Sequence, residues 1–182
     1  MRKKEYRHNP THLFIDNTAY FITAAIYKKR PLLQNPHLKT MLLERIKLCF
    51  DKHGWELHHW VILDNHYHIL GKSSRGKALS NITTDLHGFM GYHIKETTSA
   101  TGRVWWNYWD YCPRNERDYM VRLNYLLNNP VKHGYVDNLY DYPYSSFHET
   151  VESQGADGLR QQFRDYSDYR SLVLREAYDD DF

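Results

Sequence analysis

Two histidines separated by one residue are the first candidates for chemistry in this chain. His66 and His68 flank Tyr67 in a run with strand character. Because side chains two apart in a strand point to the same face of a sheet, both imidazoles could contact one divalent ion. Imidazole is a common ligand of transition metals and occurs beside carboxylate or amide oxygen in mixed sites. The spacing alone is weak evidence, since the chain has 12 histidines and His58-His59 lie nearby.

A tyrosine is the candidate nucleophile. A helix is expected over residues 116–129, with an apolar stripe made of Tyr119, Met120, Leu123, Leu126 and Leu127. Tyr125 lies roughly 200° from the centre of that stripe, so we expect it to project away from the helix's own core. Arg122 and Asn129 share its face. A nearby cation or metal favours the phenolate, and a phosphotyrosine link conserves the energy of a phosphodiester bond. The alternative is an ordinary surface tyrosine.

Charge and aromatic content favour a nucleic-acid partner without proving one. The net charge is only +2, and the C-terminus is acidic, but basic residues gather in the first part of the chain: Arg2, Lys3, Lys4, Arg7, Lys28, Lys29 and Arg30. Aromatic residues make up 15% of the chain, and such rings can stack on unpaired bases. The alternatives are a solvated terminus for the basic run and core packing for most of the rings.

Other site chemistries lack a local signature. No phosphate-cradling glycine-rich loop, Ser-His-Asp order or pair of catalytic carboxylates stands out. Cys49 and Cys112 are far apart and match no zinc spacing, which agrees with a reducing cytoplasm. No run approaches the roughly 18 apolar residues of a membrane-spanning helix, so we expect a cytoplasmic protein without a membrane partner.

The elements that must position these side chains alternate between strand and helix. Strands are expected at 20–29, 56–62, 65–71 and 104–108, and helices at 37–53, 79–96 and 116–129, the last one stopped by Pro130. The two central strands form a hairpin around a turn at 63–65. This order indicates an α+β fold with a sheet covered by helices on one face, of which the ferredoxin-like topology is one member. One or two short helices are expected near the end.

Four segments, in order, resemble the single-tyrosine HUH transposases, and most closely the REP-associated tyrosine transposases. They are YFIT at 20–23 with KRPLL at 29–33, NHYH at 65–68, YLLNNPVKHG at 125–134 and YPYSS at 142–146. The second is similar to the family's histidine-bulky-histidine motif. The third, the more specific one, is similar to its Tyr-Ile-x-x-Asn-Pro-Val-x-x-Gly helix end. The order of the matches is more telling than any one of them.

The resemblance implies a fold and a set of roles. The fold would be a ferredoxin-like antiparallel sheet, the HUH nuclease palm. His66, His68 and Asn129 would bind Mg²⁺ or Mn²⁺, and Tyr125 would be the nucleophile. The substrate would be single-stranded DNA with hairpin-forming palindromic repeats, cut and rejoined through a 5′-phosphotyrosine intermediate. The basic side chains at the start of the chain, together with Arg122, would bind the DNA, and the N-terminal arm would read a guide sequence beside the hairpin.

The resemblance also suggests an organisation for the chain. Residues 1–150 would form the catalytic domain, and 151–182 a helical tail that packs on or exchanges within a homodimer, with a monomer as the alternative. The chain departs from the family pattern at Trp106-Asn107, where the family has Trp-Gln or Trp-Glu, and at 110–113. Two rival functions stay open: a hairpin-binding repressor of the same fold without catalysis, and a metal-dependent hydrolase in which the two histidines activate water.

Overall fold

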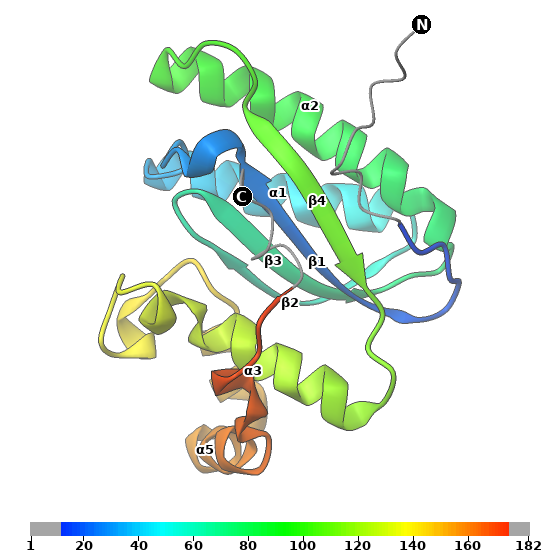
Figure 1. Ribbon diagram of the computed structural model, residues 1–182, viewed down its shortest axis with the longest axis vertical. Helices are drawn as coiled ribbons and strands as arrows, with labels where there is room; N and C mark the ends of the chain where they lie inside the picture. Colours follow the sequence, from blue (N-terminus) through cyan, green and yellow to red (C-terminus); the bar gives the residue numbers. More distant parts are fainter. Residues whose placement is uncertain (1–11, 175–182) are drawn as a thin grey trace, which may run out of the picture.

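A four-stranded antiparallel sheet forms the centre of the computed structural model, which describes residues 12–174 (Figure 1). Its strands are β1 (Ala19–Ile26), β2 (Glu56–Ile62), β3 (His66–Lys72) and β4 (Trp105–Tyr111), in the spatial order β2-β3-β1-β4. All neighbouring strands are antiparallel. A strand-helix-strand unit repeated with this order is the ferredoxin-like arrangement, so the predicted α+β class is confirmed.

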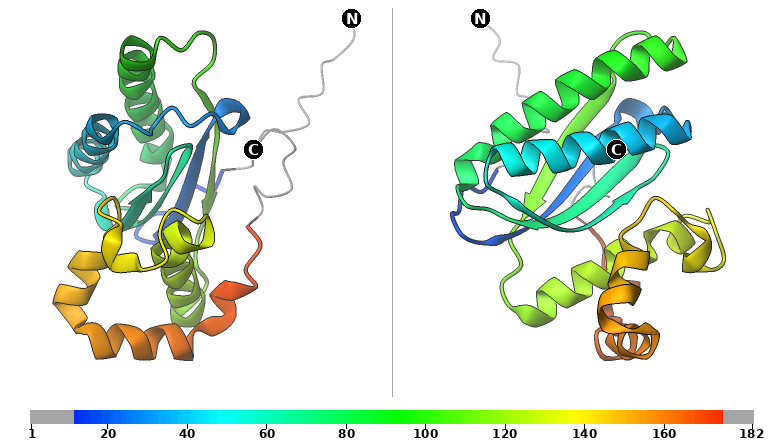
Figure 2. Two further views of the ribbon diagram at one scale, coloured as in Figure 1. Left: turned by 90° about the vertical axis from the view of Figure 1, so that its left-hand side faces the viewer. Right: turned by 180° about the vertical axis from the view of Figure 1, so that it is seen from behind.

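Two helices cover one face of the sheet, as predicted. They are α1 (Pro36–Lys52) and α2 (Leu79–Thr98), which run side by side in Figure 2. Asn35 caps α1 by accepting the His37 N–H, and Pro36 occupies the first turn, where its missing N–H costs nothing. Alternate strand residues point into this layer and form one apolar cluster with the helices, including Ile22, Ala24, Ile62, Tyr67 and Ile69.

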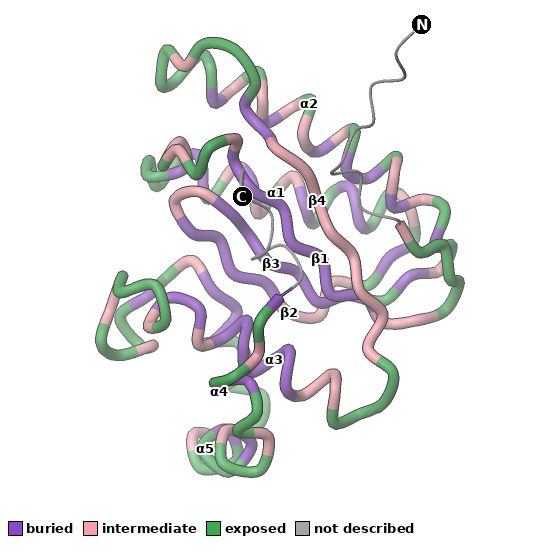
Figure 3. Tube along the Cα trace, viewed as in Figure 1, coloured by how far each residue is buried: buried purple, intermediate pink, exposed green. Residues whose placement is uncertain are grey.

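A further helical layer contacts the opposite face of the sheet. The sequence analysis did not predict this layer, because it expected helices on one face only. The layer begins with α3 (Glu116–Lys132), whose side chains pack mainly on β2 and β3. The chain then continues through η3 (Leu139–Asp141), α4 (Phe147–Gln154), α5 (Ala156–Asp165) and η4 (Ser167–Arg170). A second apolar cluster joins this layer to the strand residues that the first cluster does not use, among them Phe21, Val61 and Leu70. In Figure 3, β1 and β3 are buried along most of their length, whereas β4 is only partly buried.

The structure corrects three predicted boundaries. β1 ends at Ile26 instead of residue 29, because Lys28 and Lys29 adopt left-handed backbone conformations in the 3₁₀ turn η1 (Tyr27–Lys29). β4 extends past residue 108 to Tyr111. Pro130 does not stop α3, which continues to Lys132. A proline this close to the helix end removes one hydrogen bond, and the last turn is still closed by the N–H of His133 bonding to the carbonyl of Asn129.

The C-terminal part of the described chain packs against α3. The boundary proposed at residue 150 lies within α4, and the segment that follows contributes α5, η4 and buried side chains such as Leu159 and Tyr169 to the second apolar cluster. Exchange of this tail between protomers stays a prediction. None of the helices in residues 12–174 is long and apolar enough to cross a membrane. A short 3₁₀ turn, η2 (Gly76–Ala78), precedes α2.

Candidate metal and tyrosine site

The two histidines of β3 face α3, on the side of the sheet opposite α1 and α2. His68 pairs with Thr23 of β1, which in turn pairs with Trp109 of β4, so these three side chains form one row across the sheet. His66 pairs with Ala25 in the next row on the same face. The predicted orientation of the histidine pair is therefore confirmed, as is the packing of Tyr67 and Ile69 on the other face.

Hydrogen bonds orient the His66 ring so that one nitrogen faces the site with its lone pair. The Asn65 amide donates to the Lys29 carbonyl, at 3.2 Å, which leaves its oxygen 2.7 Å from His66 Nδ1. Nδ1 must then carry the hydrogen and donate it, and Nε2 is left as an acceptor. Burial, reinforced by His133, lowers the pKa of His66 to about 3, so the ring is neutral at physiological pH.

The Asn129 side chain meets the same lone pair. Its Oδ1 lies 3.2 Å from His66 Nε2, so two acceptors face each other across a short gap. Rotating the amide by half a turn would let its N–H₂ donate to Nε2, and a cation in the gap would satisfy both acceptors without that rotation. In the present orientation Asn129 Nδ2 is buried and has no hydrogen-bond partner within the described residues. The arrangement thus has the character of an N/O metal site.

His68 supplies a second nitrogen with an unsatisfied position. Its Nδ1 lies 2.8 Å from the Thr23 hydroxyl, whereas its buried Nε2 has no hydrogen-bond partner among residues 12–174. Burial and the neighbouring His66 hold the pKa of His68 well below its usual range, so this nitrogen is also a potential ligand. The rings of His66 and His68 are 5.0 Å apart.

The donor set fits a divalent cation with mixed nitrogen and oxygen ligands. Within the described part of the chain, no group of three or more His, Cys, Asp or Glu side chains is arranged to hold a metal. The amide oxygen of Asn129 would therefore have to complete the set with His66 and His68. The hydrogen bonds of Thr23 and Asn65 to the outer ring nitrogens are the kind of support that fixes ligating histidines.

Tyr125 lies beside this group but is not a surface residue. It is 6% exposed, and its ring makes edge contacts with His68, at 5.6 Å, and with Phe21, at 6.3 Å. Tyr125 turns away from the leucine stripe of α3, as expected. The expectation that it projects away from the core is wrong, because its side chain is buried. The helix has two buried sides: Tyr125 and Asn129 face the histidine pair, and Leu126 and its neighbours pack elsewhere in the second apolar cluster, to which Tyr125 also belongs.

Lys132 is a site residue that the sequence analysis missed. Its ammonium donates a hydrogen bond to the Tyr125 hydroxyl, at 2.9 Å, and lies 4.2 Å from the centre of the Tyr125 ring. The two residues are seven positions apart, which is two helical turns and hence the same face. That spacing could have identified Lys132 if α3 had not been expected to stop at Pro130.

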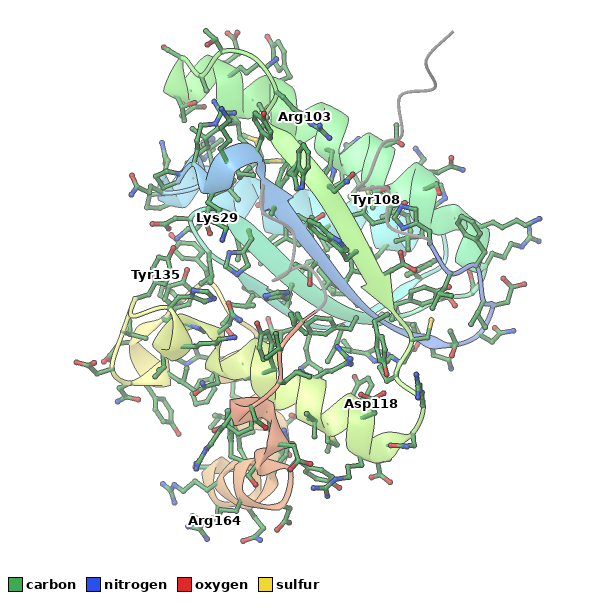
Figure 4. The ribbon with its side chains drawn as sticks, in the orientation of Figure 1. Lys29, Arg103, Tyr108, Asp118, Tyr135 and Arg164 are labelled. Atoms are coloured by element: carbon green, nitrogen blue, oxygen red, sulfur yellow. The ribbon has the colours of Figure 1, made fainter. Side chains whose placement is uncertain are left out.

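Arg122 shares the Tyr125 face, as predicted, but protein groups already engage its guanidinium. It lies 3.5 Å from the centre of the Tyr111 ring, and its Nε is 3.2 Å from a carboxylate oxygen of Asp118, which Figure 4 shows near the start of α3. Tyr111 also donates to Asp118. The geometry gives Arg122 a part in fixing α3 against the sheet, and its contact with DNA stays a prediction.

The predicted basic residues divide into three groups. Arg2, Lys3, Lys4 and Arg7 lie outside the described residues. Arg30 donates to the backbone carbonyls of Tyr27, Thr101 and Arg103, and so ties the end of β1 to the start of β4. Lys28 and Lys29 are exposed in the turn after β1, and Lys29 lines a pocket beside His66. Of these three described residues, Lys29 is the one that shares a pocket lining with His66.

His133 and Tyr135 are two further residues that the sequence analysis did not single out. The His133 ring is 5.1 Å from the His66 ring, and its pKa is lowered by burial and by the nearby cations of Lys132 and Lys29. Tyr135 lines the same pocket. Both follow directly after α3, so their closeness to β3 depends on how the chain folds back, which no local pattern reports.

Comparison with known proteins identifies relatives of this chain. A REP-associated tyrosine transposase of Escherichia coli K12 is 29% identical over 150 residues, which is 81% of this chain and 84% of that protein. A Haemophilus influenzae protein provisionally assigned to the same group is 45% identical over 47 residues, or 26% of this chain and 27% of that protein. The search against protein-family models found no match.

A solved structure shares the fold. It is a REP-associated tyrosine transposase bound to a REP hairpin, with a TM-score of 0.64 and 24% identity, covering 80% of this chain and 86% of that one. Together with the sequence match, it confirms the resemblance to the REP-associated tyrosine transposases and the ferredoxin-like palm. The relationship supports a transposase-family function for the chain.

Proposed function

We propose that this relative of the REP-associated tyrosine transposases cuts and rejoins single-stranded DNA beside hairpins, with Tyr125 as the nucleophile and a divalent cation held by His66, His68 and Asn129. The observation that carries the proposal is the group of buried acceptor atoms next to Tyr125. His68 Nε2 has no hydrogen-bond partner within residues 12–174, and His66 Nε2 faces the amide oxygen of Asn129 at 3.2 Å. A buried polar atom without a partner costs free energy, and it calls for a ligand at that point.

Mg²⁺ and Mn²⁺ are the cations proposed for this site. A bound ion would polarise a non-bridging oxygen of the scissile phosphate and stabilise charge on the departing 3′ oxygen. Two imidazole nitrogens and one amide oxygen occupy only part of the coordination sphere of such ions, so positions remain for phosphate oxygens and water.

The protein's own side chains would handle the nucleophile. In the reaction the Tyr125 oxygen bonds to phosphorus, the bond from phosphorus to the 3′ oxygen breaks, and the proton lost from the phenol is balanced by one gained at the 3′ oxygen. Lys132 holds the Tyr125 oxygen by a hydrogen bond of 2.9 Å, and its positive charge stabilises the negative charge that develops there. The product is a 5′-phosphotyrosine with a free 3′ hydroxyl, and reversal with another 3′ end rejoins DNA.

A hairpin with a single-stranded flank is the proposed substrate. The solved relative is bound to a REP hairpin, and this chain shares its fold over most of its length. A buried nucleophile such as Tyr125 can reach a splayed single strand more easily than a stacked duplex. The lysines of the turn after β1 would contact phosphates of that strand.

The test is formation of a denaturation-resistant protein–DNA band. Purified protein is incubated with hairpin-bearing single-stranded oligonucleotides and Mn²⁺, then resolved under denaturing conditions. We expect a shifted band with the wild type and none with Tyr125→Phe, which lacks only the hydroxyl. Tyr92→Ala is the matched control, because Tyr92 is 63% exposed on α2, the layer on the opposite face of the sheet.

Two outcomes would replace the proposal with a rival. Tight hairpin binding by the wild type without any band would support a repressor that has lost catalysis. Cleavage that persists in Tyr125→Phe would support a hydrolase in which the histidine site activates water.

A further inference from the structure

A pocket of about 320 Å³ opens next to His66, at the end of the site away from Tyr125. This volume lies near the lower end of the range for small-ligand pockets, which suits a single nucleotide unit. One lining residue is Ala25, which has a small side chain and pairs with His66 across the sheet. The lining residues are Ala25, Lys29, Asn65, His66, His133 and Tyr135. The lining therefore combines three aromatic rings, an amide and a cation.

The Tyr135 side chain is held in place by contacts outside the pocket. The Tyr135 hydroxyl accepts a hydrogen bond from the backbone N–H of Asp64, at 3.3 Å, and its ring packs against Tyr142, at 5.8 Å. The Lys39 ammonium, which is paired with Asp64 at 2.6 Å, lies 5.8 Å from the Tyr135 ring centre. In Figure 4, Lys29 and Tyr135 approach the same region from two segments, one after β1 and one after α3. A ring held in this way is pre-organised for stacking.

The pocket and Tyr125 lie on opposite sides of the proposed metal ligands. Along β1 the order is Phe21, Thr23, Ala25, and these pair in turn with Leu70, His68 and His66. Tyr125 contacts the Phe21 and His68 rings, whereas the pocket is lined by Ala25 and His66. α3 follows the same order from the Tyr125 end to the pocket end. His133, which comes after Asn129 in the chain, contacts His66 and lines the pocket.

Phosphoryl transfer places the attacking and leaving oxygens roughly in line, on opposite sides of phosphorus. With the Tyr125 ring on the His68 side, an in-line path past the proposed metal ligands would carry the departing 3′ oxygen toward His66. From this geometry we propose that the pocket binds the nucleotide on the 5′ side of the cleaved bond, whose 3′ oxygen leaves, with its base against Tyr135 and His133 and its phosphate near Lys29. The assignment rests on the proposed function and adds to it a nucleotide subsite and a DNA polarity.

The substrate provides the first test, because it needs no change to the protein. The cleaved bond is located by sequencing the product that bears the free 3′ hydroxyl. Oligonucleotides are then made with a single abasic residue just 5′ or just 3′ of that bond. Binding to Tyr125→Phe is measured by fluorescence anisotropy, so that the readout does not depend on cleavage. We expect the 5′ abasic residue to weaken binding about tenfold or more, as for loss of a stacked base, and the 3′ one to have a smaller effect.

A protein variant ties that penalty to the pocket. In a Tyr125→Phe background, Tyr135→Ala should bind the intact and the 5′ abasic oligonucleotides about equally, because the stacking partner is gone. Tyr135→Phe, which keeps the ring, should retain the full penalty and guards against a folding defect. Tyr92→Ala, on α2, should also behave as the parent does.

The possible failures are distinguishable. A denaturation-resistant band together with a penalty that is larger at the 3′ position, or one that survives Tyr135→Ala, would overturn the subsite while leaving the proposed function intact. The absence of any band on all hairpins would overturn the proposed function, and the subsite with it.

Discussion

The histidines on the two faces of the sheet differ in their hydrogen bonding: His87 is half-buried on one face, and His68 is buried on the other. On the α2 side, the ring of His87 stacks on Trp105, at 4.2 Å, and its Nε2 lies 2.9 Å from the Tyr67 hydroxyl. On the α3 side, His68 Nε2 is buried without a partner within the described residues. Burial lowers the pKa of both rings, so a shifted pKa does not tell them apart. The two rings differ in whether Nε2 has a partner, and this difference favours the α3 face as the place where the proposed cation binds.

Adjacent residues of β3 illustrate the same division. Ile69 points into the apolar cluster under α1 and α2, and His68 points toward Tyr125. One strand thus contributes to stability through one face and, in the proposed function, to chemistry through the other. The predictions below separate these contributions, beginning with the largest effect.

Removing a metal ligand should have the largest effect on catalysis. We expect His68→Ala to slow formation of the DNA adduct on the order of 10³-fold, because a metal contributes several kcal/mol to the transition state. The rate is measured from the denaturation-resistant band over time with Mn²⁺. His93→Ala, a histidine on α2, is the control and should match the wild type. A His68→Ala rate within tenfold of the wild type would remove His68 from the proposed site.

The neighbouring core residue should show the reverse pattern. Ile69→Ala should lower the free energy of unfolding by about 2–5 kcal/mol, because it leaves a cavity in a packed cluster. Urea denaturation followed by tryptophan fluorescence measures this change. Adduct formation per folded molecule should be retained at temperatures well below unfolding. A variant of normal stability that fails to form the adduct would contradict the division between the faces.

Acid should destabilise the fold through the buried neutral histidines. The pKa of His87 is lowered to about 3 by burial, below its ordinary value of about 6.5, so the unfolded state binds the proton more tightly. Stability contributed by this neutral ring is complete above about pH 6.5 and is lost as the pH falls toward 3, by up to about 1.4 kcal/mol per pH unit. His87→Gln should flatten the fall in unfolding free energy between pH 6.5 and 4. An unchanged slope would show that His87 is not a source of the acid sensitivity.

A divalent cation should stabilise one face only. With Mn²⁺ at about ten times its dissociation constant, the melting temperature of the wild type should rise by roughly 3–6 °C. His68→Ala should lose this rise, and His87→Gln should keep it, because the His87 ring already has its partners on the other face. Calorimetry with and without EDTA gives the comparison. Equal shifts in all three proteins would place the bound ion elsewhere.

The sequence predicted the parts of the site that depend on local period. The two-residue spacing of His66 and His68 correctly placed both on one face, and the helical spacing of Tyr125 and Asn129 correctly placed them together. The strands and the first two helices were also found, because their apolar periodicity is strong.

The remaining features depend on tertiary contacts or on conformations without a sequence signal. The burial of Tyr125 was missed because α3 lies between the sheet and the C-terminal helices, and an apolar stripe reports only one of two buried sides. Lys132 was missed because Pro130 was expected to end the helix. Lys28 and Lys29 take left-handed conformations that glycine or asparagine usually adopts. Because they are lysines, the sequence did not predict the turn after β1.

The position of the covalent bond is the most direct test of the central claim. Trypsin cuts after Arg122 and Lys132, and the peptide 123–132 contains Tyr125 as its single tyrosine. The protein is incubated with a hairpin oligonucleotide and Mn²⁺, digested with nuclease and trypsin, and examined by mass spectrometry. The account predicts a nucleotide phosphate attached to this peptide at Tyr125. A nucleotide on another tyrosine, such as Tyr119 or Tyr135, or cleaved DNA without any modified peptide, would contradict it.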